Sequence, residues 1–221
     1  MKECFGMTEV SASFLSADFL ELKKEIKRCE SAGCRYIHID VMDGNYVDNL
    51  AIGVCVTKCI SKGTSLRLDA HMAVLNPMGL VDAFADAGID TYMFHPETCY
   101  HHYRLIDRIR KSGMKVGVVL TPTSPISIIK HFIKEIDVID QLAVDVGFPH
   151  QVFRSEVYNK LRELKKIKLE NVYNYEIQVD GGINDDTAKL AIDAGAETLI
   201  VGSWLFENQD MGKFVNMVKS Y

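Results

Sequence analysis

Short apolar runs alternate with longer amphipathic stretches along the chain. The runs are rich in β-branched residues, as in Tyr36-Ile37-His38-Ile39, which is typical of buried strands. In the first amphipathic stretch, Phe19, Leu22, Ile26 and Cys29 have the spacing of one buried helix face. The pattern therefore predicts strands that alternate with helices. The strands are expected at residues 9–15, 36–40, 66–71, 92–94, 116–119, 138–144, 175–180 and 198–201.

A glycine follows several of the amphipathic stretches, in the position where a left-handed residue caps the end of a helix. These glycines occur in Ala32-Gly33, Ala87-Gly88, Ser112-Gly113 and Ala194-Gly195. Their separations are multiples of about 25 to 28 residues, roughly the length of a strand, a helix and two short loops. A chain of 221 residues holds about eight such units. We therefore expect an α/β protein, with residues 1–221 forming a single-domain (β/α)8 TIM barrel.

Two further signals bear on this fold. The start of a helix is expected where an N-cap residue or a proline at the first helical position occurs. The candidate N-caps are Ser16, Asn76, Ser124 and Asn184, and the candidate first-position prolines are Pro77 and Pro125. The rival fold is an open doubly wound sheet, but the first strand is not followed by a glycine-rich dinucleotide turn. The barrel is therefore the better interpretation.

Composition and charge exclude several classes of protein. Hydrophobic residues make up 48% of the chain and charged residues 25%, which is unlike a disordered or fibrous protein. The net charge of −5 argues against nucleic-acid binding. Neither a signal peptide nor an apolar segment of about 20 residues is found, so we expect no membrane partner and a cytoplasmic protein.

The six cysteines are Cys4, Cys29, Cys34, Cys55, Cys59 and Cys99. A cytoplasmic protein of this size does not need a disulfide framework, so we expect reduced thiols. Cys55 and Cys59 could share one helix face as metal ligands, and this stays open as a less favoured alternative.

Polar residues lie where three of the predicted strands end. His38 and Asp40 are two apart and so point to the same side of their strand, His71 ends the next strand, and Asp180 ends the seventh. In a barrel these ends meet at one mouth. Two imidazoles and two carboxylates suit one divalent transition metal per chain, which can be Zn, Fe, Mn or Co. His95, also near a strand end, is expected to be a hydrogen-bonded core residue.

A metal flanked by two carboxylates favours proton transfer at a carbon next to a carbonyl. The metal would polarise the carbonyl, while the carboxylates would act as acid and base on opposite faces and invert the stereocentre. A glycosidase also uses two carboxylates, but it has no need for the paired histidines.

Several segments resemble the ribulose-phosphate 3-epimerase family, in order and at the expected spacing between about residues 9 and 206. They are Val10–Phe19, the string His-Ile-Asp-Val-Met-Asp-Gly at 38–44, Asp69–Met72, Val179–Gly182, and Gly202-Ser203 followed by Phe206. The resemblance implies that His38, Asp40, His71 and Asp180 bind the metal. It also implies that Asp40 and Asp180 epimerise C3 of a ketose phosphate through a cis-enediolate, most simply between D-ribulose 5-phosphate and D-xylulose 5-phosphate.

The same resemblance implies where the small sugar phosphate binds and that the protein is a homo-oligomer. Met42 would support the site beside the enediolate, and the phosphate would lie on backbone N–H groups at the barrel mouth. The residues implied at the substrate or its phosphate are Ser13, His71, Gly147, Gly181, Gly182, Gly202 and Ser203. The middle of the chain, for example His95-Pro96-Glu97-Thr98, is similar to the allulose-6-phosphate 3-epimerase branch, which makes that substrate an alternative.

The loop after the sixth strand departs from the family pattern. Where the family has Pro-Gly-Phe-Gly-Gly-Gln, this chain has Val146-Gly147-Phe148-Pro149-His150-Gln151. Pro149 removes an amide donor and His150 adds bulk near the phosphate, although His150 could supply a cation instead. Ala73 and Leu142 also replace family methionines. A barrel that binds sugar phosphate without turnover is therefore the alternative from another class.

Overall fold

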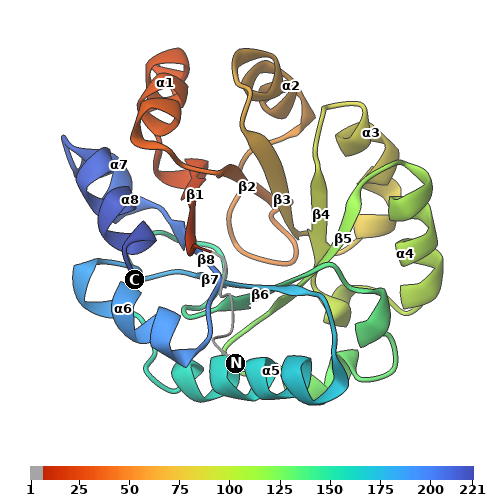
Figure 1. Ribbon diagram of the computed structural model, residues 1–221. Coiled ribbons are helices and arrows are strands. Elements are labelled where there is room, and N and C mark those ends of the chain that lie inside the picture. Colours follow the sequence, from red (N-terminus) through yellow and green to blue (C-terminus); the bar gives the residue numbers. More distant parts are fainter. Residues whose placement is uncertain (1–6) are drawn as a thin grey trace.

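Eight parallel strands close into a barrel in the computed structural model, which describes residues 7–221 (Figure 1). Each strand pairs with the next in the sequence, and β8 returns to pair with β1. The predicted (β/α)8 barrel is therefore confirmed. The strands are β1 (Glu9–Ser13), β2 (Tyr36–Met42), β3 (Arg67–Ala73), β4 (Thr91–Phe94), β5 (Lys115–Leu120), β6 (Val138–Leu142), β7 (Glu176–Asp180) and β8 (Thr198–Val201).

Helices surround the ring of strands (Figure 1). The α-helices are α1 (Leu22–Ala32), α2 (Val54–Gly63), α3 (Val81–Ala85), α4 (His102–Lys111), α5 (Val157–Asn171), α6 (Asp185–Ala194), α7 (Ser203–Glu207) and α8 (Met211–Lys219). Short 3-10 helices are η1 (Phe14–Ser16), η2 (Pro77–Leu80), η3 (Pro96–Thr98), η4 (Ile126–Ile129) and η5 (Ile133–Glu135). Within residues 7–221, none of the helices has the length and apolar character needed to cross a membrane.

The regular strand–helix alternation breaks between β5 and β6. This connection holds η4 and η5 where an α-helix was expected, and β8 is followed by both α7 and α8. The segment 126–136 carries a high density of isoleucine and follows Pro125, and β-branched residues lose side-chain freedom in a helix. Its apolar side chains reach the core from these 3-10 turns, since Ile126, Ile129, Ile133 and Ile136 are buried.

The predicted capping glycines all have positive φ, between 81° at Gly33 and 122° at Gly195, which confirms them as helix ends. Asn76 and Asn184 are confirmed as N-caps, since their side chains accept from backbone N–H groups of η2 and α6. The N-caps predicted at Ser16 and Ser124 are wrong. Ser16 is the last residue of η1, and Ser124 bonds instead to Thr121 across a turn.

Two details of the helix starts also differ from expectation. Pro77 occupies the first position of η2 as predicted, whereas Pro125 stands one residue before η4. In α1, Ile26 and Cys29 are buried as the stripe required, but Phe19 precedes the helix and is 45% exposed. The prediction that Phe19 belongs to the buried face of this helix is wrong, because residues 17–21 form a loop between η1 and α1.

The outer face of the strands is apolar, whereas the inner face carries polar residues on several strands. On β2, Ile37, Ile39 and Val41 belong to the core between strands and helices, whereas His38 and Asp40 alternate with them and point into the barrel. Apolar residues fill part of the barrel interior, in a cluster of Met93, Val119, Val138 and Leu142. Polar side chains inside the barrel are therefore shielded from water, and the hydrogen-bond partners available to them are side chains of neighbouring strands.

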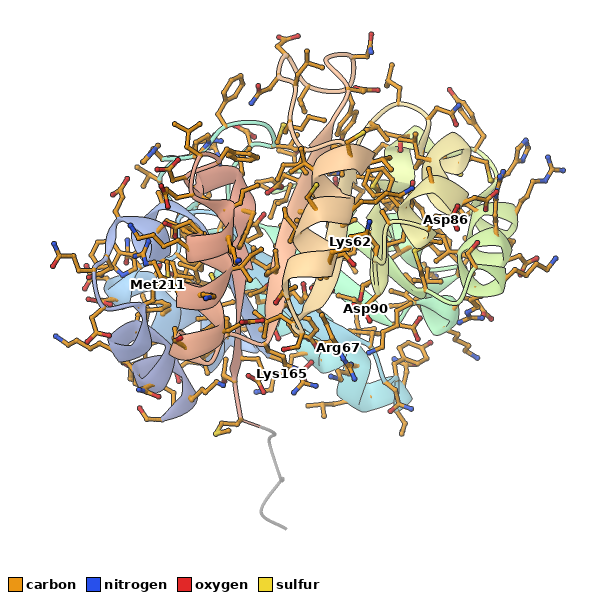
Figure 2. All side chains as sticks on the ribbon, turned by 90° about the horizontal axis from the view of Figure 1, so that it is seen from above. Lys62, Arg67, Asp86, Asp90, Lys165 and Met211 are labelled. Atoms are coloured by element: carbon orange, nitrogen blue, oxygen red, sulfur yellow. The ribbon has the colours of Figure 1, made fainter. Side chains whose placement is uncertain are left out.

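Figure 2 shows the two ends of the barrel from the side. Arg67, the first residue of β3, marks the end at which the strands begin. The predicted site residues stand at the other end, because His71 and Asp180 lie in the carboxyl-terminal halves of β3 and β7.

We expect the α6 cap to stabilise the fold. The side chain of Asn184 accepts from Asp186 N and Thr187 N, and Thr187 Oγ1 accepts from Asn184 N. Asn184→Ala removes the acceptor and should lower the free energy of unfolding by about 1 kcal/mol, measured by urea denaturation. Asn208→Ala, at an exposed position after α7, is the control and should change it by less than about 0.5 kcal/mol. Equal effects of the two changes would contradict the capping role.

Candidate functional site

Strand register brings the candidate ligands together. Asp40 on β2 lies directly beside His71 on β3, and His38 lies beside Ser13 on β1. Asp180 is the last residue of β7. His38, Asp40, His71 and Asp180 each place one ligand atom within 4.8 Å of all the others. The first three are buried and Asp180 is partly exposed, so the group faces the mouth of the barrel.

Asp40 is the most strongly bonded member of this group. Its Oδ2 accepts from Ser13 Oγ at 2.9 Å, and its Oδ1 lies 3.1 Å from His71 Nδ1 and 3.7 Å from His38 Nε2. Burial alone would favour the neutral acid, but the nearby His38, and then the hydrogen bond from His71, outweigh it and hold the pKa of Asp40 well below its usual range. Asp40 is therefore an ionised carboxylate.

Asp180 has the opposite electrostatic character. Burial, followed by the charges of Asp140 and Asp40, raises its pKa to about 7, despite the opposing effect of His38. Its carboxylate receives no hydrogen bond from residues 7–221. One mouth therefore holds a carboxylate that stays ionised and another that can carry a proton near neutral pH, which is the pattern of an acid and base pair.

His38 lies beneath the other three groups and is fully buried. Neither of its ring nitrogens has a hydrogen-bond partner in the described part of the chain. Burial disfavours its cation, but Asp40, then Asp180 and Asp140, raise its pKa to about 10. Asp40 Oδ1 lies 3.7 Å from His38 Nε2, too far for a hydrogen bond, so the buried ring presents nitrogen atoms that no hydrogen bond occupies. The nitrogen and oxygen donors of the group therefore fit a divalent transition metal.

The other predicted substrate residues line one cavity together with Asp40, His71 and Asp180. They are Ser13, Met42, Gly147, His150, Gly181, Gly182, Gly202 and Ser203. The cavity lies at the carboxyl ends of the strands, where barrel enzymes hold their active sites. Met42 packs with Ala73 in an apolar cluster at the same mouth, while Leu142 lines the cavity from β6.

Two glycines after β7 allow the main chain to form the cavity wall. A Cβ on Gly182 would lie 2.5 Å from Phe153 N, and one on Gly181 would lie 2.4 Å from Val144 Cγ2. Both residues also have positive φ, 97° at Gly181 and 67° at Gly182. Only glycine meets both requirements, so the backbone itself borders the cavity here.

The loop after β6 closes the cavity from the side and carries His150, the residue that could supply a cation to the phosphate. His150 has a φ of 62° and is largely exposed, and its Nδ1 lies 3.7 Å from Glu207 Oε1. Its imidazole is therefore paired with a carboxylate at the rim. Asn49 Nδ2 donates to Gly147 O at 2.7 Å, which joins this loop to the loop after β2.

Two buried acids of the barrel interior were not predicted as site residues. Asp69 and Asp140 are fully buried, and their carboxylate oxygens have no hydrogen-bond partner in the described chain. Burial raises the pKa of each to about 7. The available signal was an aspartate at the centre of the apolar run Val138–Leu142, where alternation places residue 140 on the inner face.

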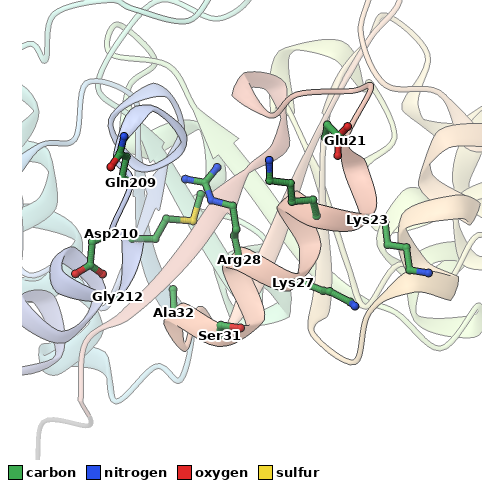
Figure 3. A pocket seen from close by; sticks show the side chains of 11 residues that line it. Glu21, Lys23, Lys27, Arg28, Ser31, Ala32, Gln209, Asp210 and Gly212 are labelled. Carbon is green, nitrogen blue, oxygen red and sulfur yellow. The ribbon is translucent and has the colours of Figure 1, made fainter.

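The remaining candidates lie elsewhere. Cys55 and Cys59 are free and exposed on α2, and the structure joins them to no group of three potential metal ligands within residues 7–221. Cys29, Cys34 and Cys99 are free as expected, and Cys4 lies outside the described residues. A basic hollow between α1 and α8, lined by Lys27, Arg28 and other residues, lies on the outside of the barrel and shares no lining residue with the cavity described above (Figure 3).

Comparisons with known proteins identify the family of this chain. Residues 9–206 match the ribulose-phosphate 3 epimerase family. The ribulose-phosphate 3-epimerase of Bacillus subtilis is 39% identical over 96% of this chain and 99% of that protein. The enzyme of that name from Methanocaldococcus jannaschii is 38% identical over 93% and 87%. A mutant tryptophan synthase α-subunit from Pyrococcus furiosus superposes with a TM-score of 0.67 at 12% identity, covering 97% of this chain and 98% of that one, which shows the fold alone.

The buried Asp140 predicts a pH-dependent stability of the metal-free protein. Its folded pKa of about 7 lies above the ordinary value of 3.8, so the folded state binds the extra proton between these values. The stability from this group is therefore lost as pH rises through 7. Asp140→Asn should gain stability relative to the wild type over that range, by a few kcal/mol above pH 7.

Urea denaturation at several pH values in the presence of a chelator measures this difference. The exposed Asp107→Asn is the matched control and should show no such trend. A difference between Asp140→Asn and wild type that stays constant from pH 4 to 8 would contradict the interpretation.

Proposed function

The chain belongs to the ribulose-phosphate 3-epimerase family, and on that premise we propose that it is a metal-dependent 3-epimerase acting on D-ribulose 5-phosphate and D-xylulose 5-phosphate. The observation that carries the proposal is the pair of carboxylates, Asp40 and Asp180, which line one cavity beside His71. Inversion at a carbon needs a group that removes a proton and another that returns one from the opposite face.

His38, Asp40, His71 and Asp180 would hold the divalent metal. A bound divalent cation supplies Lewis-acid chemistry, because it polarises a carbonyl and stabilises negative charge on its oxygen. The donor set supports a transition metal and does not select among Zn, Fe, Mn and Co.

Asp40 and Asp180 would move the proton at C3. In one direction Asp40 removes the C3 proton, the electron pair of the C–H bond moves toward the C2 carbonyl oxygen, and a cis-enediolate forms. Asp180 then delivers a proton to the other face of C3, and the roles reverse for the opposite epimer. Ser13 donates to Asp40 Oδ2, so it fixes the orientation of this carboxylate.

Backbone groups at Gly181, Gly182, Gly202 and Ser203 would bind the phosphate, with Gly147 on the opposite side of the cavity. The protein has a net charge of −5, so an anionic substrate depends on such local donors. Glu207 Oε1 lies 3.7 Å from His150 Nδ1, so a carboxylate stands beside the β6 loop. The homo-oligomer and the cytoplasmic location expected from the sequence stay predictions.

A panel of sugar phosphates tests the proposed activity. With the metal-loaded protein we expect conversion of ribulose 5-phosphate to xylulose 5-phosphate, and at least tenfold lower kcat/KM for allulose 6-phosphate. Unphosphorylated ribulose should react far more slowly, because it lacks the group that the backbone donors bind. Faster turnover of allulose 6-phosphate would assign the hexulose substrate instead. Binding of ribulose 5-phosphate without turnover of any compound would indicate a non-catalytic barrel.

Isotope exchange tests the two carboxylates. In deuterium oxide, wild-type enzyme should incorporate deuterium at C3 of the product, measured by mass spectrometry. Asp40→Asn and Asp180→Asn each remove one acid–base group and should lower the exchange rate by about 10² to 10⁴. Asp107→Asn serves as the surface control. Exchange near the wild-type rate in either site variant would refute the two-base scheme.

A further inference from the structure

His95 lies directly against a metal-ligand candidate. It follows β4, and its side chain is fully buried. Its Nε2 lies 2.8 Å from His71 Nε2, and the two ring centroids are 5.0 Å apart. The ring of Tyr46 packs against His95 at 4.7 Å between centroids. This histidine is thus confirmed as a hydrogen-bonded buried residue, but its partner is a site residue.

The two nitrogens of His71 face different neighbours. Nδ1 lies 3.1 Å from Asp40 Oδ1, on the side of the ligand group, whereas Nε2 faces His95. A neutral imidazole carries one proton and one free lone pair. If His71 binds a metal on the side of Asp40, its Nδ1 must supply the lone pair and its Nε2 must carry the proton.

We propose that His95 is a positioning residue that accepts the hydrogen bond from His71 Nε2–H and so directs the lone pair of His71 Nδ1 toward the metal. The proposal rests on metal binding by His71 in the proposed function. Metal-binding histidines usually donate their second N–H to a carboxylate, a backbone carbonyl or water. In residues 7–221 the only partner at His71 Nε2 is the His95 imidazole.

Metal binding would then reverse one hydrogen bond. Without metal, His71 Nδ1–H donates to Asp40 and His95 Nε2–H donates to His71 Nε2. With metal, His71 carries its proton on Nε2 and donates to His95, whose own proton moves to Nδ1. Each ring keeps one proton, so the number of bound protons does not change. His95 Nδ1 has no hydrogen-bond partner in the described chain, so its N–H lacks an acceptor in the loaded state, a cost that the bond between His71 Nδ1 and the metal must exceed.

Nitrogen NMR of the wild-type protein tests the tautomers directly. In ¹⁵N-labelled protein loaded with zinc, we expect the proton on Nε2 of His71 and on Nδ1 of His95. After zinc removal, the proton should lie on Nδ1 of His71 and on Nε2 of His95. A proton on His95 Nε2 in the loaded protein, or a zinc-bound signal from His95 itself, would overturn the proposal.

Two variants test the effect on metal affinity. His95→Phe keeps a ring but removes the acceptor, and zinc affinity, measured by chelator competition, should fall about 10- to 100-fold. His95→Gln keeps an acceptor oxygen and should stay within about threefold of wild type. His102→Phe is the matched control, because His102 bonds to Pro96 O and stacks on Phe132 near the same loop, outside the cavity. It should bind zinc as wild type does.

The outcomes separate this proposal from the proposed function. Wild-type zinc affinity in His95→Phe, or equal losses in His95→Phe and His95→Gln, would overturn the role of His95 even in an active epimerase. The expected affinity pattern in a protein that turns over no sugar phosphate would contradict the epimerase and leave the role of His95 supported. Melting curves of the metal-free variants show whether a substitution lowers zinc affinity by destabilising the fold. If it does, the NMR measurement of the wild-type tautomers decides whether His95 has the proposed role.

Discussion

The placement of Asp40 beside His71 in the β2–β3 register is the contact on which the site depends. A shift of β2 by one residue would turn Asp40 to the outer face, against the helices and away from His71. The register is fixed because Ile37, Ile39 and Val41 on the same strand must stay in the outer core. The ordinary burial of aliphatic side chains thus determines which polar groups meet inside the barrel.

The polar interior has an electrostatic cost that a bound cation would relieve. His38 has no hydrogen-bond partner, and Asp69 and Asp140 lie buried without one in the described chain. His38 lowers the pKa of Asp40, whereas burial and the charge of Asp140 raise the pKa of Asp180 to about 7. Because the same groups set the charge of the site and weaken the interior, catalytic capacity and stability are coupled in this barrel.

The sequence allowed the barrel to be predicted because each repeat contains its own local signals. A left-handed glycine such as Gly33 depends on its neighbours along the chain, and so does the Asn184 cap. Ser124 failed as a cap because its hydroxyl is bonded within a turn, and the missing helix after β5 depends on how isoleucines reach the core. These outcomes are set by tertiary contacts that a sequence pattern does not contain.

The site was predictable to a similar degree. The candidate ligands stand at strand ends, where alternation and barrel geometry bring them together, and the structure places them within 4.8 Å of one another. The contact of His95 with His71 was not foreseen, because it crosses from β3 to the end of β4. Asp140 was not predicted as a site residue, because one aspartate within an apolar strand belongs to no recognisable motif.

The glycine-built wall of the cavity limits how the pocket can be redesigned. At Gly181 and Gly182 any side chain would collide with Val144 or Phe153, so directed evolution cannot reshape this wall one residue at a time. Variation is sterically easier on the opposite rim, where His150 is exposed and lines the same cavity. A laboratory effort to change the accepted sugar length would start from libraries at the β6 loop and leave the metal ligands and the glycines untouched.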